Sequence, residues 1–430
     1  MLACKKLLYF AVNFIKLKNV KKLIQYSVTT LLLLGSVFSA CASFSALYAF
    51  GDGVCTTTSN NPAPSDVSRY YGHRESNGRV WIEVLAQRQG LTYDPNKNLS
   101  YFGNYSSVLV GNINNTNKFI APTDATNDLF IVWVCDADFV YDIQNIYPSV
   151  DAVKDWNPAI GLSLTNHFNI ITNLYAKGVR TLIMPNAVDI TEVPYYNQIV
   201  SASDRSFVRG RVAYFNTNLN TIVNQAKSVC PGLKIYVPDI FSLLDDVLAN
   251  AGDYGLTNAR YLGQPIAAMD AFNYGYPTAA TNGYGTNYIF WDYQDPTAKM
   301  HAVIADYVQQ IISPVRFSKV AQVNGSNRLD VVNLPVGLNG YLDGSTNPVP
   351  GSWTFVTNFN SLTSTQSLFV ATPPLPVGFG SGFTNGSGGS GGVSLDPNNP
   401  GTNTVSGTNS FFYSAAQFYR LRFPFAWNWP

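Results

Sequence analysis

Between about Phe44 and Pro314, continuous apolar runs alternate with amphipathic stretches, and this alternation is the feature that most restricts the fold. Runs such as FIVWVCDADF and GLKIYVPDIF lack the every-second-residue pattern of a half-exposed strand, which indicates strands buried on both faces. Residues 78–90 and 204–232 instead space their apolar side chains as helices do. Strands that alternate with helices predict an α/β fold with a mainly parallel sheet covered by helices on both faces.

The composition and the hydrophobic pattern of the sequence change after residue 314. Short β-prone runs are separated by Asn, Gly and Pro, and residues 373–409 are rich in Gly, Ser, Pro and Asn. We therefore expect a main domain over residues 43–314 and a small antiparallel β-module over 315–430, with a long flexible insertion at 373–409. The aromatic tail of the module either forms a binding face or fills the core of a small sandwich.

Residues 1–42 have the layout of a secretory signal peptide. Six Lys and no acidic residue precede a short apolar run that ends in Ala40-Cys41-Ala42, an A-x-A cleavage site. Alternatively, Cys41 is a lipidated first residue, which Phe38 disfavours because a lipobox prefers Leu or Val at that position. No later run is long and apolar enough to span a membrane. We expect an exported protein, located in a periplasm, on the cell surface or outside the cell.

Charge and cysteine content exclude several classes of function. Only 12% of the residues are charged, and removing the six Lys of the leader turns the net charge of +1 into about −5, which argues against nucleic acid as a partner. Beyond the leader the chain has three Cys (Cys55, Cys135 and Cys230) and three His, without CxxC, HExxH or zinc-type spacing. We expect no metal and no cofactor, and one disulfide at most.

Four separated stretches resemble, in order, the sequence blocks of the SGNH or GDSL hydrolases, secreted esterases and lipases with a three-layer α/β/α fold. These stretches are LYAFGDGV, SNGRVWIEVLA, VWVCDADF and FWDYQDPTAKMHAVIADYV, and the resemblance covers roughly Phe44 to Ile312. No single block is specific, but their order and spacing together are. The resemblance implies an α/β/α sandwich and, as the family's activity, hydrolysis of carboxylic esters.

The resemblance also places the family's catalytic positions on this chain. The nucleophilic Ser falls on Gly53, the oxyanion-hole Gly on Gly103 and the oxyanion-hole Asn on Ala137, while Gly53 and Gly103 keep their backbone donors. The acid of the Asp-x-x-His pair is kept as Asp292, but the His falls on Asp295. Loss of the nucleophile or the base alone lowers the rate of such a triad by several orders of magnitude. We therefore expect no ordinary serine esterase activity.

Two cysteines fall at the site when the chain is compared with the family's sequence blocks. Three alternatives are open for them. Cys55 and Cys135 form a disulfide that pins the pocket, or they are buried small side chains, or one is a thiol nucleophile, although no His is placed to activate it.

Further candidates at the site are carboxylates and one histidine. The family uses Asp52 and Asp138 structurally, so the informative new carboxylate besides Asp295 is Asp136. His301 matches a second His of many members and is expected to be structural, while His73 and His167 are expected in a loop and on a helix surface.

The sequence thus predicts an exported GDSL-type domain that keeps its pocket as a ligand-binding or surface protein, a pseudoenzyme. Candidate ligands are a carbohydrate, an acyl ester or a lipid. The alternative is an active hydrolase with a changed mechanism in which Asp292 and Asp295 act as acid and base. Like charges spaced in this way raise the pKa of one carboxyl, as acid and base chemistry requires.

Overall fold

The computed structural model describes residues 44–57, 69–324, 326–346, 348–349, 351–371 and 418–423. The predicted signal peptide, including Cys41, and the predicted insertion at 373–409 lie outside these residues. None of the helices in the described ranges is long and apolar enough to cross a membrane.

A four-stranded parallel sheet forms the centre of the main domain. Its strand order follows the chain: β1 (Leu47–Gly51), β2 (Leu129–Trp133), β3 (Thr181–Ile183) and β4 (Lys234–Tyr236). Every residue of β2 is buried, as expected for a strand covered on both faces. The predicted parallel sheet is confirmed.

The strands end sooner than the apolar runs that predicted them. In VWVCDADF the strand stops at Trp133 and α4 (Cys135–Asn145) begins two residues later. Asp136 and Asp138 fall in the first turn of α4, where carboxylates interact favourably with the positive end of the helix dipole. The third block therefore spans a strand end and a helix start, which places Asp136 and Ala137 at the carboxyl edge of the sheet.

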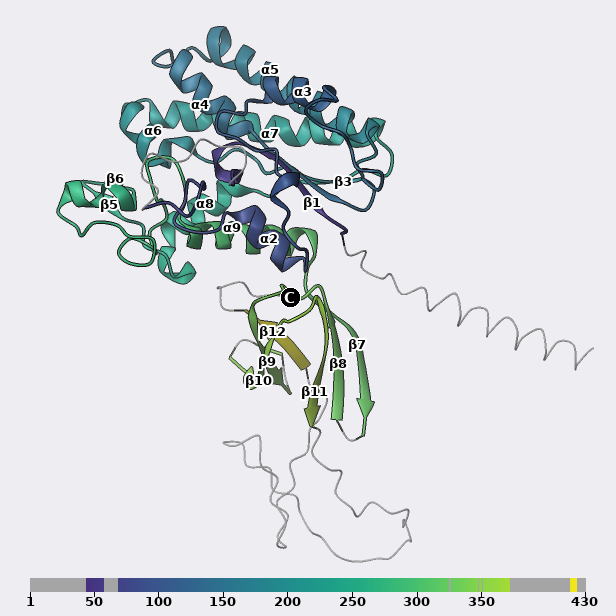
Figure 1. Cartoon of the computed structure of the whole chain (residues 1–430). Helices are drawn as coiled ribbons and strands as arrows, with labels where there is room; N and C mark the ends of the chain where they lie inside the picture. The colour runs from purple at the N-terminus through teal and green to yellow at the C-terminus, as the bar shows by residue number, and fades with distance from the viewer. Residues whose placement is uncertain are drawn as a thin grey trace, which may run out of the picture. The chain divides into compact units, whose positions relative to one another are not determined.

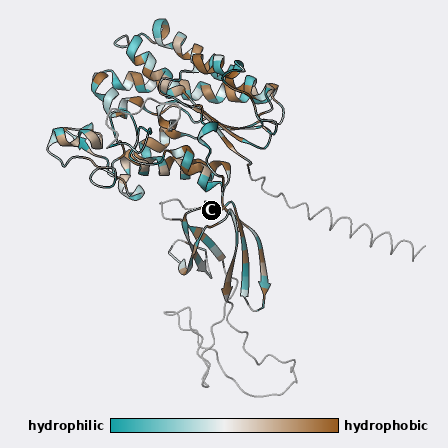
Figure 2. Ribbon diagram, viewed as in Figure 1, coloured by the Kyte–Doolittle hydropathy of each residue, from teal (hydrophilic) through white to brown (hydrophobic). Residues whose placement is uncertain are grey.

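Helices cover both faces of the sheet. In Figure 1, α3, α5 and α7 lie on one side and α2, α8 and α9 on the other, which confirms the three-layer α/β/α architecture. Figure 2 shows these helices striped with hydrophilic and hydrophobic residues, as amphipathic helices should be. These helices are α2 (Trp81–Arg88), α3 (Ser106–Asn114), α5 (Asn157–Ala176), α7 (Arg205–Val229), α8 (Ile240–Ala249) and α9 (Ala298–Ile312), and the short helix α6 spans Pro194–Ile199.

The C-terminal part contains two antiparallel sheets of three strands each, ordered β11-β8-β7 and β10-β9-β12. Leu329, Leu342, Leu421 and Phe423 belong to the small apolar core of these sheets. Of the aromatic tail, only 418–423 is described, and its buried residues belong to this core. The antiparallel β-rich character is as predicted, while the boundaries of the two domains remain predictions. The strands are β7 (Arg316–Val323), β8 (Ser326–Val332), β9 (Asn339–Ser345), β10 (Thr354–Asn360), β11 (Thr365–Ala371) and β12 (Phe418–Arg422).

Candidate functional site

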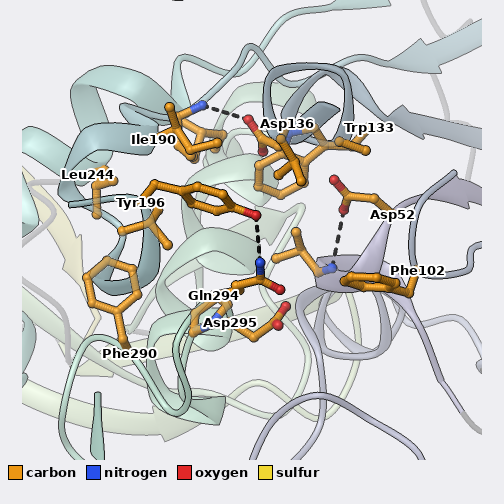
Figure 3. Close-up of a pocket in the computed structure, with 18 of the residues that line it drawn as sticks. Asp52, Phe102, Trp133, Asp136, Ile190, Tyr196, Leu244, Phe290, Gln294 and Asp295 are labelled. Atoms are coloured by element: carbon orange, nitrogen blue, oxygen red, sulfur yellow. Dashed lines mark hydrogen bonds between the residues drawn. The ribbon is translucent and has the colours of Figure 1, made fainter. Parts of the chain in front are cut away.

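A cavity of about 160 Å³ lies at the carboxyl ends of β1 and β2. In open parallel sheets this edge is where ligands bind. One part of the cavity wall is apolar, and in Figure 3 the labelled Ile190, Leu244 and Phe290 gather on the left of the pocket. The other part carries carboxyl groups, and no Lys, Arg or His is present among the described residues that line it. The cavity is therefore apolar at one end and acidic at the other.

Two of the lining carboxyls lie just beyond the ends of the neighbouring strands β1 and β2. Asp52 follows β1 and caps the short 3-10 helix η1 (Gly53–Cys55), because its Oδ1 accepts a hydrogen bond from the backbone N–H of Val54 at 3.2 Å. Asp136 accepts a hydrogen bond from the backbone N–H of Val188 at 2.9 Å. Burial raises the pKa of Asp136 to about 7. Burial, and then the charge of Asp136, raises the pKa of Asp52 well above its usual range.

A side chain at Gly53 would have to displace the carboxylate of Glu75. A Cβ atom built on Gly53 would lie 2.6 Å from Oε2 of Glu75 and 3.5 Å from Oδ1 of Asp295. Phe102 would approach the same atom to 3.5 Å. The Glu75 carboxylate thus occupies the space in which a Ser at this position would begin. Sequence reasoning missed Glu75, whose only signal is that it directly precedes the second block, SNGRVWIEVLA.

Asp292 and Asp295 form a hydrogen-bonded pair of carboxyls. Asp292 accepts hydrogen bonds from the hydroxyl of Tyr70 at 2.8 Å and from the backbone N–H of Asp295 at 2.8 Å. The side chains of the two aspartates also share a hydrogen bond. Burial raises the pKa of Asp295 well above its usual range, and the charges of Glu75, Asp292 and Asp52 raise it further. Asp295 is therefore the member that holds the proton, and its carboxyl O–H donates a hydrogen bond to Asp292.

The remaining positions of the family's oxyanion hole also face the cavity. Gly103 lines it with a φ of +73°, a left-handed conformation that favours glycine. Ala137 lines it with a methyl group, which offers no hydrogen-bond donor. Thus Gly53, Gly103, Ala137 and Asp295 meet at one cavity, whereas Asp292 reaches it only through Asp295.

The two site cysteines lie outside the cavity lining. Cys55 and Cys135 are buried free thiols, so the disulfide alternative is wrong and the buried-thiol alternative is confirmed. Burial raises the pKa of both thiols well above the usual range, and nearby aspartates add to the effect. Cys55 accepts a hydrogen bond from the indole N–H of Trp81 at 3.2 Å. A neutral buried thiol of this kind is a poor nucleophile.

Asp138, predicted to line the site, faces away from the cavity. Its carboxylate accepts hydrogen bonds from the backbone N–H of Ser106 at 2.9 Å and from the hydroxyl of Ser163 at 2.5 Å. It therefore joins the start of α4 to α3 and α5.

The three histidines lie outside the cavity lining as well. His301, predicted to line the site, is fully buried on α9, and burial lowers its pKa to about 3. His167 was expected on a helix surface, but it is buried, because α7 covers this face of α5 and places Phe215 against the ring. His73 lies in a loop, as expected.

Polar groups that sequence reasoning did not single out complete the site. The amide of Gln294 donates a hydrogen bond to the hydroxyl of Tyr196 at 2.6 Å (Figure 3). Trp133, the last residue of β2, also lines the cavity. In the described ranges, no group of three or more His, Cys, Asp or Glu side chains could hold a metal ion.

Comparisons with known proteins show what this chain is similar to. Residues 47–308 match the family model of GDSL-like lipases and acylhydrolases, which is more than half of the chain. A GDSL esterase/lipase of Arabidopsis thaliana is 24% identical over 214 residues, which span 48% of this chain and 58% of that relative. A second one from the same plant is 23% identical over 340 residues, which span 66% of this chain and 91% of that relative. Among solved structures, a gut microbial diltiazem-metabolizing enzyme matches with a TM-score of 0.37 and 8% identity over 73% of this chain and 60% of that chain.

Proposed function

The chain belongs to the GDSL-like lipase/acylhydrolase family, and from this premise we propose that it is a member that binds a small neutral ligand without serine hydrolysis. The family's pocket is kept in place at the carboxyl edge of the sheet. Its chemistry has changed, because carboxyl groups stand where the family has a hydroxyl nucleophile and an imidazole base. We regard the domain as a binding protein built on a hydrolase fold.

One observation supports this proposal above the others, the position of the Glu75 carboxylate. Its Oε2 lies 2.6 Å from where a Cβ on Gly53 would be, so the nucleophile is absent and its place is filled. A hydrolase that had lost only its Ser would keep an open space there. With Asp295 also at this point, two carboxyl groups replace the Ser and His that acyl transfer requires.

Electrostatics work against an oxyanion in this cavity. Acyl transfer develops negative charge on the substrate oxygen, which hydrolases stabilise with fixed donors. Ala137 supplies no side-chain donor, and the cavity is lined by Asp52, Asp136 and Asp295. Above about pH 7, where Asp136 is ionised, its carboxylate about 4 Å from an oxyanion would cost about 4 kcal/mol at an effective dielectric constant of about 20, or roughly a thousandfold in rate. Neutral apolar molecules avoid this cost.

The proposal is tested by measuring turnover and binding on the same protein. We expect no hydrolysis of p-nitrophenyl butyrate above the buffer rate and no labelling by a fluorophosphonate, which reacts with activated serines. Ethyl butyrate should nevertheless bind, as measured by calorimetry. The Ala137→Phe variant, which fills the cavity, should lose this binding while keeping the circular dichroism spectrum of the unmodified protein. Fluorophosphonate labelling, or no ethyl butyrate binding, would contradict the proposal.

A second candidate function is hydrolysis by a carboxyl pair, favoured by the hydrogen bond between Asp292 and Asp295. A protonated and an ionised carboxyl held together can act as acid and base. If turnover of p-nitrophenyl butyrate is found, the Asp292→Ala/Asp295→Ala double variant decides the mechanism. Turnover lost in that variant supports the pair, and turnover that persists shows that another group is the nucleophile.

Export of the protein is part of the same proposal. The basic and then apolar leader that ends at Ala40-Cys41-Ala42 supports it. The N-terminal sequence of the protein recovered outside the cytosol should begin directly after residue 42. Recovery of a lipid-modified Cys41 would support the anchored alternative, and recovery of the uncleaved chain in the cytosol would contradict export.

A further inference from the structure

The indole N–H of Trp133, a residue that lines the cavity, is a buried donor that makes no hydrogen bond of normal geometry. Trp133 is 1% exposed, lines the cavity and makes no hydrogen bond through Nε1. An unpaired buried donor costs about 1–3 kcal/mol, so such a group in a native fold calls for an explanation. Two other buried indoles of the same domain have partners, since Trp81 donates to Cys55 and Trp156 to the carbonyl of Ser149.

A carboxyl group lies beside this donor. Nε1 of Trp133 is close enough to Asp136 to lower the pKa of that carboxyl, although the two make no hydrogen bond of normal geometry. One oxygen of Asp136 is occupied by the backbone N–H of Val188. In Figure 3 the two side chains lie next to each other at the end of the pocket that also holds Asp52. A ligand group placed here meets a donor and an acceptor together.

The chemistry of the two groups selects among ligand head groups. A ligand carboxylate finds no Lys or Arg among the described residues of the cavity to balance its charge. An ammonium group has no lone pair with which to accept a hydrogen bond from the indole. A carbonyl oxygen accepts from the indole but donates nothing to Asp136. A hydroxyl group does both.

We propose that Trp133 and Asp136 together bind the hydroxyl group of a small apolar alcohol, whose hydrocarbon part fills the apolar end of the cavity. This inference rests on the proposed binding function and names its ligand class. The hydroxyl oxygen accepts from Nε1 of Trp133 and its hydrogen is donated to Asp136. A cavity of about 160 Å³ suits about six carbon atoms, since an engineered cavity of about 150 Å³ binds benzene.

The test compares three ligands with the same chain and different heads: 1-hexanol, hexylamine and hexanoate. Binding is followed by NMR titration of the protein with ¹⁵N-labelled tryptophan. We expect 1-hexanol to bind most tightly and to shift the Nε1–H signal of Trp133, which is assigned by its absence in Trp133→Phe. That variant should bind 1-hexanol about three- to tenfold more weakly, the loss of one hydrogen bond.

Trp291→Phe is the matched control. Trp291 is also fully buried with an unpartnered Nε1, but it does not line the cavity. Its replacement should change 1-hexanol affinity less than twofold. Tightest binding by hexylamine, a Trp133 signal that does not move as 1-hexanol binds, or equal 1-hexanol affinity in Trp133→Phe would overturn the inference. If ethyl butyrate binds and none of the three probes does, this inference alone fails. If all four fail to bind, the proposed function fails with it.

Discussion

At the scale of single residues, the change at the nucleophile position is a replacement rather than a deletion. The space next to Gly53 holds the Glu75 carboxylate, which a side chain at residue 53 would have to displace. Because Glu75 is partly buried beside Asp295, moving it changes the surroundings of both carboxyls. Restoring a Ser at this position therefore requires a change at Glu75 as well.

This conflict predicts a coupling between the two residues. Gly53→Ala should lower the free energy of unfolding by about 1 kcal/mol, because inserted atoms in a packed site force neighbours to shift. In a Glu75→Ala background the same substitution should cost about half as much or less. Urea denaturation of the four proteins of this double-mutant cycle measures the difference. Equal effects of Gly53→Ala in both backgrounds would show that Glu75 does not occupy this space.

The sequence predicted the positions of the site better than its contacts. Family blocks placed Gly53, Gly103, Ala137 and Asp295, all of which line the cavity, because each follows a strand or a loop whose place the fold determines. Glu75 could not be found in this way, since it lies in a loop just before the second block and only its side chain approaches Gly53. Contacts that depend on loop paths and side-chain rotamers leave no periodic pattern in a sequence.

At the scale of elements, the helix layers were predictable and the strand ends were not. The apolar spacing of α7 identified its buried face correctly, since Val212, Phe215, Leu219 and Val223 are all buried. In the third block, by contrast, continuous apolar character runs from β2 into α4, and apolar runs alone do not separate a buried strand from a buried helix start.

A buried ion pair joins α2 to α9 on the same face of the sheet. Nε of Arg88 lies 2.6 Å from Oδ1 of Asp306, and both side chains are buried. The guanidinium also donates to the carbonyl of Val336 at 3.2 Å. Removing one partner of a buried pair leaves the other charge without compensation.

We therefore predict that Arg88→Met lowers the free energy of unfolding by about 3–5 kcal/mol. Arg88→Met/Asp306→Leu should recover most of this loss, because no buried charge then remains. Thermal or urea denaturation of the two variants tests this. A double variant that is as unstable as the single one would mean that packing, and not the ion pair, determines stability here.

At the scale of the whole molecule, buried carboxyl groups control how stability depends on pH. Burial is the largest cause of the raised pKa at each of Asp52, Asp136, Asp142 and Asp295. The pKa reaches about 7 at Asp136 and at Asp142. In the unfolded chain an Asp ionises near pH 4. Above that pH the folded protein binds more protons than the unfolded chain, so its stability falls as the pH rises.

Two buried histidines act in the opposite direction. Burial lowers the pKa of His167, and it lowers that of His301 to about 3. Below about pH 6.5 the unfolded chain protonates these side chains while the folded protein keeps them neutral, which favours unfolding in acid. Between about pH 4 and 6.5 the effect of the four carboxyls on the free energy of unfolding exceeds the opposite effect of the two histidines. Above that range only the carboxyls make stability depend on pH. We therefore expect stability to fall with rising pH, most steeply near pH 7.

Each carboxyl that is protonated only in the folded state contributes a slope of about 1.4 kcal/mol per pH unit. The midpoint of urea denaturation should thus decrease from pH 5 to pH 8. Asp142→Asn provides a control away from the cavity, since it removes one such carboxyl without removing its shape. The variant should be less sensitive to pH than the unmodified protein between pH 5 and 7 and should exceed it in stability at pH 8. A midpoint that increases between pH 6 and 8 would mean that these carboxyls are ionised in the fold, and the acidic end of the cavity would then be suited to a cation instead of a hydroxyl group.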